Sequence, residues 1–173
     1  RIRAILLGFN DGLVAVLGAV SGFFAAFQAI SSVLIASSTV AVAGAISMAA
    51  GAYVAMGSGV EVEKTMLRKK RFLGEDNGEG VAVRPLNSAI VVGVSYFIGA
   101  LVPVLPVLFG AQNLFASIIA AGITIVIVSY LLAFLSGMDV KRRIIMNVVI
   151  MALAVSITYT IGSIATNIWG VAL

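Results

Sequence analysis

The hydrophobic residues of this chain gather into five long runs, and almost all of its charged residues lie between them. The runs cover approximately residues 4–30, 32–58, 86–110, 113–137 and 143–170. An α-helix needs about 20 apolar residues, at about 1.5 Å of rise each, to cross the hydrocarbon core of a bilayer. The pattern therefore predicts an all-α integral membrane protein whose protomer is one domain with five transmembrane helices.

The composition supports this class and excludes several others. Hydrophobic residues make up 61% of the 173 residues and charged residues only 10%, whereas soluble domains carry about 25% charged residues. The chain has no cysteine and no histidine, which excludes disulfides and metal sites built from thiolate or imidazole. Because no nucleophile–base pair or cofactor motif is visible, we expect neither an enzyme nor a permanently bound cofactor.

The chain begins with Arg1 rather than Met, so we expect a short N-terminal piece to precede it. The first apolar run is too long for the core of a signal peptide and is expected to be retained.

The basic residues determine the predicted orientation, because all 11 lie on one side of the predicted helices. They precede the first run or lie in the second and fourth connections: Arg1, Arg3, Lys64, Arg68, Lys69, Lys70, Arg71, Arg84, Lys141, Arg142 and Arg143. The positive-inside rule then places the N-terminus in the cytoplasm and the C-terminus outside. The net charge of +4 is explained by topology and by contact with anionic lipid, so we expect no nucleic-acid partner.

The one substantial polar stretch, 59–85, is interpreted as a short cytoplasmic extension and loop. Its first part, "GVEVEKTMLRKKRF", is able to continue the second helix into the cytoplasm, and "GEDNGEG" then forms a turn. In the third run, Pro103 and Pro106 indicate a kink or helix end before a tight turn, or else free carbonyl groups that line a path.

Asp11, in "GFNDGLVAVLGAVSG", is the only acidic residue inside a predicted span. Two GxxxG pairs, Gly8 with Gly12 and Gly18 with Gly22, predict close helix packing around it and a contact at the axis of a homodimer. An intramembrane carboxylate is costly, so Asp11 should face protein or water. It is either an inert hydrogen-bonded contact between helices or a functional group that exchanges ions.

Met48, in "AGAISMAAGAY", lies on a small-residue face of the second run. Counting from the cytoplasmic ends, Met48 is about 15 Å and Asp11 about 12 Å into the membrane, so their depths are similar. A carboxylate together with a thioether suits a borderline ion such as Fe²⁺ better than Ca²⁺ or Mg²⁺. A methionine in a membrane helix also occurs as simple packing, and its coincidence with Asp11 is what singles it out.

These two motifs and "FIGALVPVLPVLFG" in the third run resemble the vacuolar iron transporter family across all five spans. The resemblance implies a homodimer with its path between protomers, which moves Fe²⁺ and often Mn²⁺ out of the cytoplasm in exchange for protons. Asp11 and Met48 match the residues that line that path. The membrane would be the cell membrane in a prokaryote, or a vacuolar or other organellar membrane in a eukaryote.

Two features depart from the long members of that family. They insert a glutamate-rich metal-binding domain between the second and third spans, whereas this chain has only 59–85, like the shorter, nodulin-like branch. Glu61 and Glu63 match the start of the acidic extension and are expected near the cytoplasmic mouth of the path. Ala52 stands where the family often has an acidic residue.

Two other functions fit parts of the sequence. One is a proton-coupled exporter of organic cations resembling the small multidrug resistance family, which would need aromatic walls around Asp11. The other is a membrane assembly protein held together by its GxxxG contacts and transporting nothing.

Overall fold

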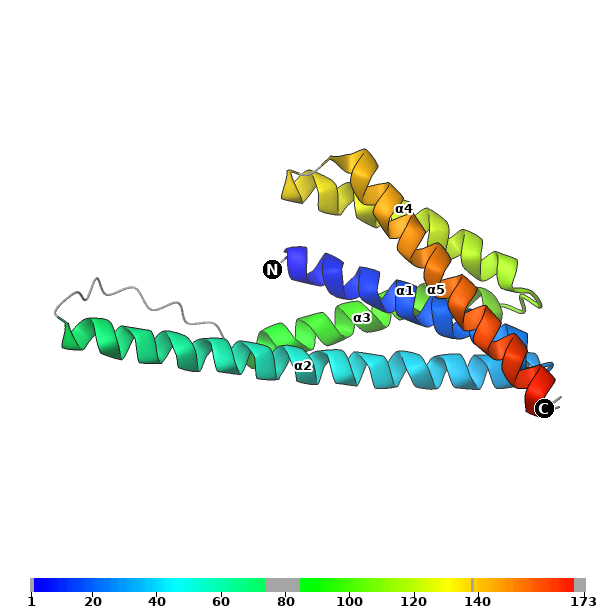
Figure 1. The fold of residues 1–173 in the computed structure, drawn as a ribbon, viewed down its shortest axis with the longest axis horizontal. Helices are drawn as coiled ribbons and strands as arrows, with labels where there is room; N and C mark the ends of the chain where they lie inside the picture. The colour runs from blue at the N-terminus through cyan, green and yellow to red at the C-terminus, as the bar shows by residue number, and fades with distance from the viewer. Residues whose placement is uncertain (1, 74–84, 138, 170–173) are drawn as a thin grey trace.

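A computed structural model describes residues 2–73, 85–137 and 139–169, and the described part of the chain contains five α-helices and no strand (Figure 1). The helices are α1 (Ile2–Ala26), α2 (Ile30–Phe72), α3 (Pro85–Leu108), α4 (Leu114–Ser136) and α5 (Val140–Trp169). Each is long and apolar enough to cross a membrane. The predicted fold class, an all-α membrane protein with five spanning helices, is confirmed.

The second helix extends furthest beyond its predicted apolar run. It continues to Phe72, whereas the apolar run ends near residue 58, and its last turns carry Lys69, Lys70 and Arg71. The segment beginning at Gly59 is therefore helical, as its sequence allowed. Its basic residues are well placed, because cations near a helix C-terminus are favoured by the helix dipole. The rest of the predicted loop, residues 74–84, lies outside the described residues.

The helix ends form two groups at opposite ends of the bundle. Figure 1 shows the start of α1, the end of α2, the start of α3 and the α4–α5 connection toward one end, with the end of α5 and the α1–α2 and α3–α4 connections toward the opposite end. Every described Lys and Arg therefore lies toward the first group of ends. This arrangement matches the side that the charges predict to be cytoplasmic.

Local sequence explains where several helices begin and end. Pro85 opens α3, where its missing N–H costs nothing. Gly137 ends α4 in the left-handed conformation, with φ of 64°. The Asp139 carboxylate then accepts a hydrogen bond from the Lys141 backbone N–H at 3.0 Å, which caps the first turn of α5.

The first helix is the centre of the bundle, because it contacts all four others. Its contact with α3 is very close: a Cβ added at Gly12 would overlap the Tyr96 backbone, and one added at Gly99 would overlap the Phe9 carbonyl group. At the far end of α1, a Cβ at Gly162 of α5 would overlap the Gly22 carbonyl oxygen. Glycines therefore allow α1 to approach its neighbours backbone to backbone.

A hydrogen bond joins the last turns of α3 to the first turn of α4, beside the connection between them. The buried Ser117 hydroxyl of α4 donates a hydrogen bond to the Pro103 carbonyl oxygen of α3 at 2.8 Å. Helix α3 then continues to Leu108, two residues past Pro106. The prolines thus lie in the last turns of the helix before its connection to α4.

The helices differ strongly in how much of their apolar surface the protomer covers. Of the most hydrophobic stretch of each helix, 44% is buried inside the protomer in α1, 17% in α2 and only 6% in α5. Much of α2 and α5 is therefore available to lipid or to another protein.

Candidate functional site

Asp11 lies on the one face of α1 that the rest of the protomer leaves open. Ala4, Leu7, Asp11 and Ala15 recur at intervals of three or four residues, and all four are exposed. The other faces are covered by the neighbouring helices, with Gly8, Gly12 and Leu13 buried. The carboxylate lies nine residues, or about 14 Å, from the start of α1 at Ile2, which is well inside the span.

Tyr96 of α3 connects the helix of Asp11 to the helix of Met48. Its backbone packs directly on Gly12, the residue after Asp11. Its ring and hydroxyl group pack on Gly44 of α2, one helical turn before Met48. Tyr96 of α3 thus packs on α1 next to Asp11 and on α2 one turn from Met48.

Met48 is half-buried and packs against the core cluster that includes Val16 and Tyr96. On either side of it, Ala45 and Ala49 pack on Gly93 of α3. Because the same part of α3 receives Gly8 and Gly12 of α1, Met48 and Asp11 lie at about the same depth. The structure therefore places both residues where the helical rise predicted them, although they project from different helices.

Asn10 adds an unusual polar group beside Asp11. Its side-chain oxygen Oδ1 is buried and has no hydrogen-bond partner among the described residues. Buried polar atoms without a partner are rare in folded proteins, because they lose the hydrogen bonds that water would give them. An amide oxygen held in this state is a ready ligand for a water molecule or a cation.

The four glycines of α1 pack within the protomer, which corrects their expected place at a dimer contact. A Cβ at Gly8 would lie 3.0 Å from the Val92 carbonyl oxygen of α3, and one at Gly22 would lie 3.0 Å from the Thr158 carbonyl oxygen of α5. Gly12 likewise packs on α3, and Gly18 faces α5. Close packing was the right physical expectation, but its partners are α3 and α5 of the same chain.

Glu61 and Glu63 lie apart from this site. Glu61 is exposed and Glu63 half-buried on the extension of α2, and Glu61 is thirteen residues, or about 20 Å, beyond Met48. Among the described residues, no three His, Cys, Asp or Glu side chains are close enough together to hold a metal ion.

Tyr96 was not predicted from the sequence, and Asn10 was assigned no role. Tyr96 stands among apolar residues in "VGVSYFIGA" and has no motif that distinguishes it from an ordinary core aromatic residue. Asn10 could have been noticed, because an amide beside the only intramembrane carboxylate is a second polar group in an apolar run. What the sequence could not provide was its burial.

Comparison with known proteins identifies the fold family of this arrangement. The model of the VIT family matches residues 2–81 and 73–163, which together cover most of the chain. The chain belongs to the VIT family. The family predicted from the motifs around Asp11 and Met48 is thus confirmed.

Individual members of the VIT family show how far the similarity extends. Vacuolar iron transporter homolog 4 of Arabidopsis thaliana is 29% identical over 161 residues, which cover 91% of this chain and 80% of that protein. VIT-like transporter 1b of Glycine max is 33% identical over 117 residues, covering 64% of this chain and 51% of that protein. A vacuolar iron transporter of Acanthamoeba castellanii is 40% identical over 79 residues, 46% of this chain and 27% of that protein.

Proposed function

We propose that this protein carries divalent transition-metal ions out of the cytoplasm, Fe²⁺ first and Mn²⁺ as well, in exchange for protons. The observation that carries the proposal is Asp11, a carboxylate exposed on the protomer surface at mid-membrane depth, level with the thioether of Met48. Ionisable groups inside a membrane are expensive, so such a group indicates an ion pathway. The names of the relatives, vacuolar iron transporters and their homologues, support the same substrate class.

The donor atoms that we propose for the site favour a borderline metal ion. A carboxylate alone suits Mg²⁺ or Ca²⁺, whereas a thioether prefers softer ions. Asp11 oxygen, Met48 sulfur and the buried Asn10 amide oxygen together suit Fe²⁺, with Mn²⁺ relying on the oxygen atoms. The ion is a transported substrate in this proposal, and the protein needs no resident cofactor and performs no enzymatic reaction.

A homodimer would complete the path. Five helices cannot divide into two equal halves, so a two-fold symmetric path needs a second copy. The exposed stripe of Ala4, Leu7, Asp11 and Ala15 would face that copy. Two Asp11 carboxylates facing each other would hold either one metal ion or protons, which is the requirement for exchange. The membrane would be vacuolar or another organellar membrane in a eukaryote, and the cell membrane in a prokaryote.

The structure offers less support for a carrier of organic cations. Such a site needs exposed aromatic faces around the carboxylate. Tyr96, whose backbone packs on Gly12 beside Asp11, is only 6% exposed and its ring is packed on Gly44, so it presents no open aromatic face.

The test is metal-driven proton movement in proteoliposomes that contain either the native protein or the Asp11→Asn variant. We expect the native protein to transport Fe²⁺ or Mn²⁺ with opposing proton flux. Asp11→Asn should retain the fold and lose transport, because the amide keeps hydrogen bonding but no charge. The matched control is Asp139→Asn, which changes an exposed acid at the start of α5 and should leave transport unchanged. Transport retained by Asp11→Asn would refute the assignment.

A further inference from the structure

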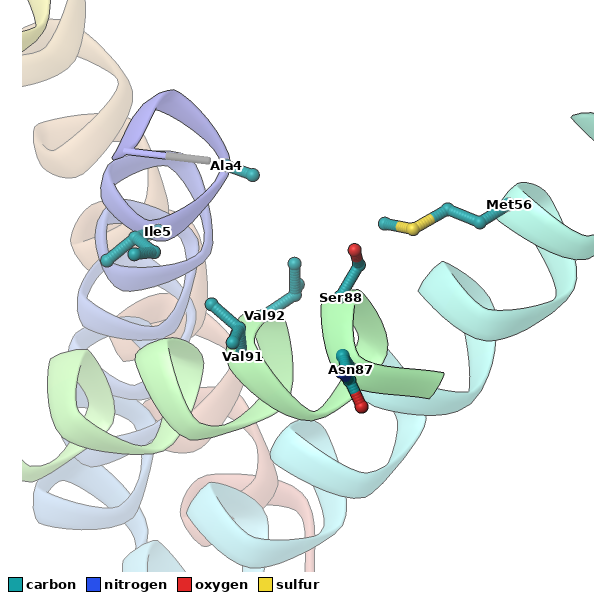
Figure 2. Close-up of a pocket in the computed structure, with 7 residues that line it drawn as sticks. All are labelled: Ala4, Ile5, Met56, Asn87, Ser88, Val91 and Val92. Carbon is teal, nitrogen blue, oxygen red and sulfur yellow. The ribbon is translucent and has the colours of Figure 1, made fainter. Parts of the chain in front are cut away.

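A cavity of about 340 Å³ opens between α1, α2 and α3 on the side predicted to be cytoplasmic. Its wall includes residues of all three helices: Ala4, Ile5, Met56, Ser88, Val91 and Val92. Figure 2 shows the Ser88 hydroxyl group and the Met56 thioether directed toward the same space, whereas the Asn87 amide points away from it. None of the described side chains that line the cavity is ionisable. The cavity is therefore a mainly apolar space with a hydroxyl group in its wall.

The cavity lies at the depth where the hydrocarbon core of a bilayer meets the cytoplasmic head groups. Met56 is two residues before the end of the apolar run of α2, near residue 58. Ala4 lies in the first turn of α1 and Ser88 in the first turn of α3. Past this depth α2 continues as a helix to Phe72 (Figure 1). A molecule in the cavity would therefore have one end among apolar side chains and the other end at the membrane surface.

Basic residues predominate just beyond the cavity. The part of α2 after Ser58 carries five basic residues and two acidic ones. Lys64, the first of the five, lies eight residues, or about 12 Å, beyond Met56 along the helix. On α1, Arg3 directly precedes Ala4. Lys and Arg residues next to the cytoplasmic leaflet attract anionic lipids. The apolar wall thus suits an acyl chain, and its basic surroundings suit an anionic head group.

The volume of the cavity also fits a chain better than it fits water. A buried water molecule needs two to four polar partners, and apolar cavities stay dry. An apolar cavity of about 150 Å³ takes up benzene, with its six carbon atoms, so about 340 Å³ has room for roughly a dozen carbon atoms of a chain. Lipid chains are as apolar as leucine, so a chain gains no hydrophobic free energy by leaving the bilayer. It would be retained by van der Waals contacts with the cavity wall and by the charge of its head group.

We propose that this cavity binds one anionic phospholipid of the cytoplasmic leaflet, with an acyl chain between α1, α2 and α3 and its head group toward Lys64 and Arg3. The chain would lie beside the part of α1 that precedes Asp11, because Val92 of the cavity wall packs on Gly8. This inference does not depend on which ion the protein carries.

Lipid retention in detergent tests the site without requiring transport. The protein is reconstituted in vesicles of phosphatidylglycerol and phosphatidylcholine in equal amounts, dissolved again in mild detergent and washed, and the remaining phospholipid is counted per protomer by mass spectrometry. We expect the native protein to retain one phosphatidylglycerol per protomer. Val91→Phe should retain about a tenth as much, a loss of ~1.4 kcal/mol in binding free energy, because the aromatic ring takes the space of the chain.

The matched control is Val94→Phe, which adds the same ring at an exposed position of α3 outside the cavity wall and should leave retention unchanged. Ser88→Leu is a second, independent variant that fills the cavity and removes its hydroxyl group, so it should also lose the lipid. Adding phosphatidylglycerol back to the washed protein should raise the melting temperature of the native protein and of Val94→Phe, but not that of Val91→Phe. A ligand that binds only the folded state stabilises that state.

Several results would overturn the proposal. One is a native protein that retains no phospholipid, and another is equal retention by the native protein and Val91→Phe. Loss of the lipid from Val94→Phe as well would assign the lipid to the outer surface of α3 instead of the cavity. Equal retention of phosphatidylcholine and phosphatidylglycerol would refute the role of the basic residues. None of these measurements involves metal, so their failure would leave the proposed function unchanged.

Discussion

Replacing single glycines of α1 and α2 by alanine should lower the free energy of unfolding at some positions and raise it at others. The space around each glycine predicts the order of these effects. At Gly12 the added methyl group would overlap the Tyr96 carbonyl group. A backbone group cannot rotate away, so α1 and α3 must separate by about 1 Å to restore van der Waals contact. Overpacking of this kind costs about 1–3 kcal/mol, which outweighs the gain of about 0.5–1 kcal/mol in helix propensity.

The other glycines provide internal controls for this prediction. At Gly18 the nearest atoms to an added Cβ are 3.5 Å and more away, so alanine should be close to neutral. At Gly51 of α2 no atom lies within 4 Å, so alanine should stabilise the protein by about 0.5–1 kcal/mol through helix propensity alone. Gly8, where the nearest atom is a carbonyl oxygen at 3.0 Å, should fall between Gly12 and Gly18.

The assay is equilibrium unfolding in mixed micelles by titration with sodium dodecyl sulfate, together with the oligomeric state of each variant. We expect Gly51→Ala to be the most stable variant, followed by the native protein and Gly18→Ala, which should be about equal. Gly8→Ala should be less stable than these, and Gly12→Ala the least stable. A Gly18→Ala variant that loses at least as much stability as Gly12→Ala would refute the reasoning. If Gly18→Ala instead shifted the oligomeric state without changing the protomer's stability, the glycine would belong to an interface between copies.

Three further predictions concern the polar and sulfur-containing side chains. Met48→Leu keeps the volume and apolarity of the side chain, so the free energy of unfolding should change by less than about 1.5 kcal/mol. Uptake of Fe²⁺ and Co²⁺ into vesicles should fall more than uptake of Mn²⁺, because only the sulfur is lost. Equal, near-native uptake rates for all ions would make Met48 a packing residue. Asn10→Leu removes a buried oxygen atom that has no partner among the described residues, so it should not lower stability in the same titration. It should, however, reduce metal uptake. Undiminished uptake would show that Asn10 is not part of the site. Ser117→Ala deletes the hydrogen bond to Pro103 and should cost about 0.6 kcal/mol, the average for such bonds in membranes, and at most about 1.7; a loss beyond that range would indicate that the hydroxyl group supports more than this contact.

The sequence was sufficient to predict the five helices, because each apolar run is bounded by charges or turn residues that a bilayer core would exclude. Counting residues along each helix also predicted correctly that Asp11 and Met48 lie at similar depth, since helical rise is uniform. The identity of packing partners could not be derived in this way. A GxxxG pair indicates that some backbone comes close, but nothing in the neighbourhood of Gly12 specifies Tyr96, which follows 84 positions later in the chain.

The packing of Tyr96 against α1 and α2 could not be predicted for a related reason. An aromatic residue in an apolar run has the same sequence signature whether its hydroxyl group faces a site or the core. Its contacts with both Gly12 and Gly44 come from three helices that meet at one level, and periodicity within a single helix carries no information about such a meeting.

The exposure of Asp11 links the assembly of this protein to its proposed chemistry. A carboxylate at the centre of a membrane helix costs about 2.5–3.5 kcal/mol on insertion scales, and a protomer alone in lipid would bear this cost on its exposed α1 stripe. In the proposed homodimer, a second copy that covers the stripe would remove the contact with lipid, but it would bring two carboxylates together, and like charges in a low dielectric repel strongly. The pair is stable only when a divalent cation or protons offset that repulsion. In that proposed arrangement each occupant would exclude the other, so the cation or protons that permit association would also be mutually exclusive, as exchange requires.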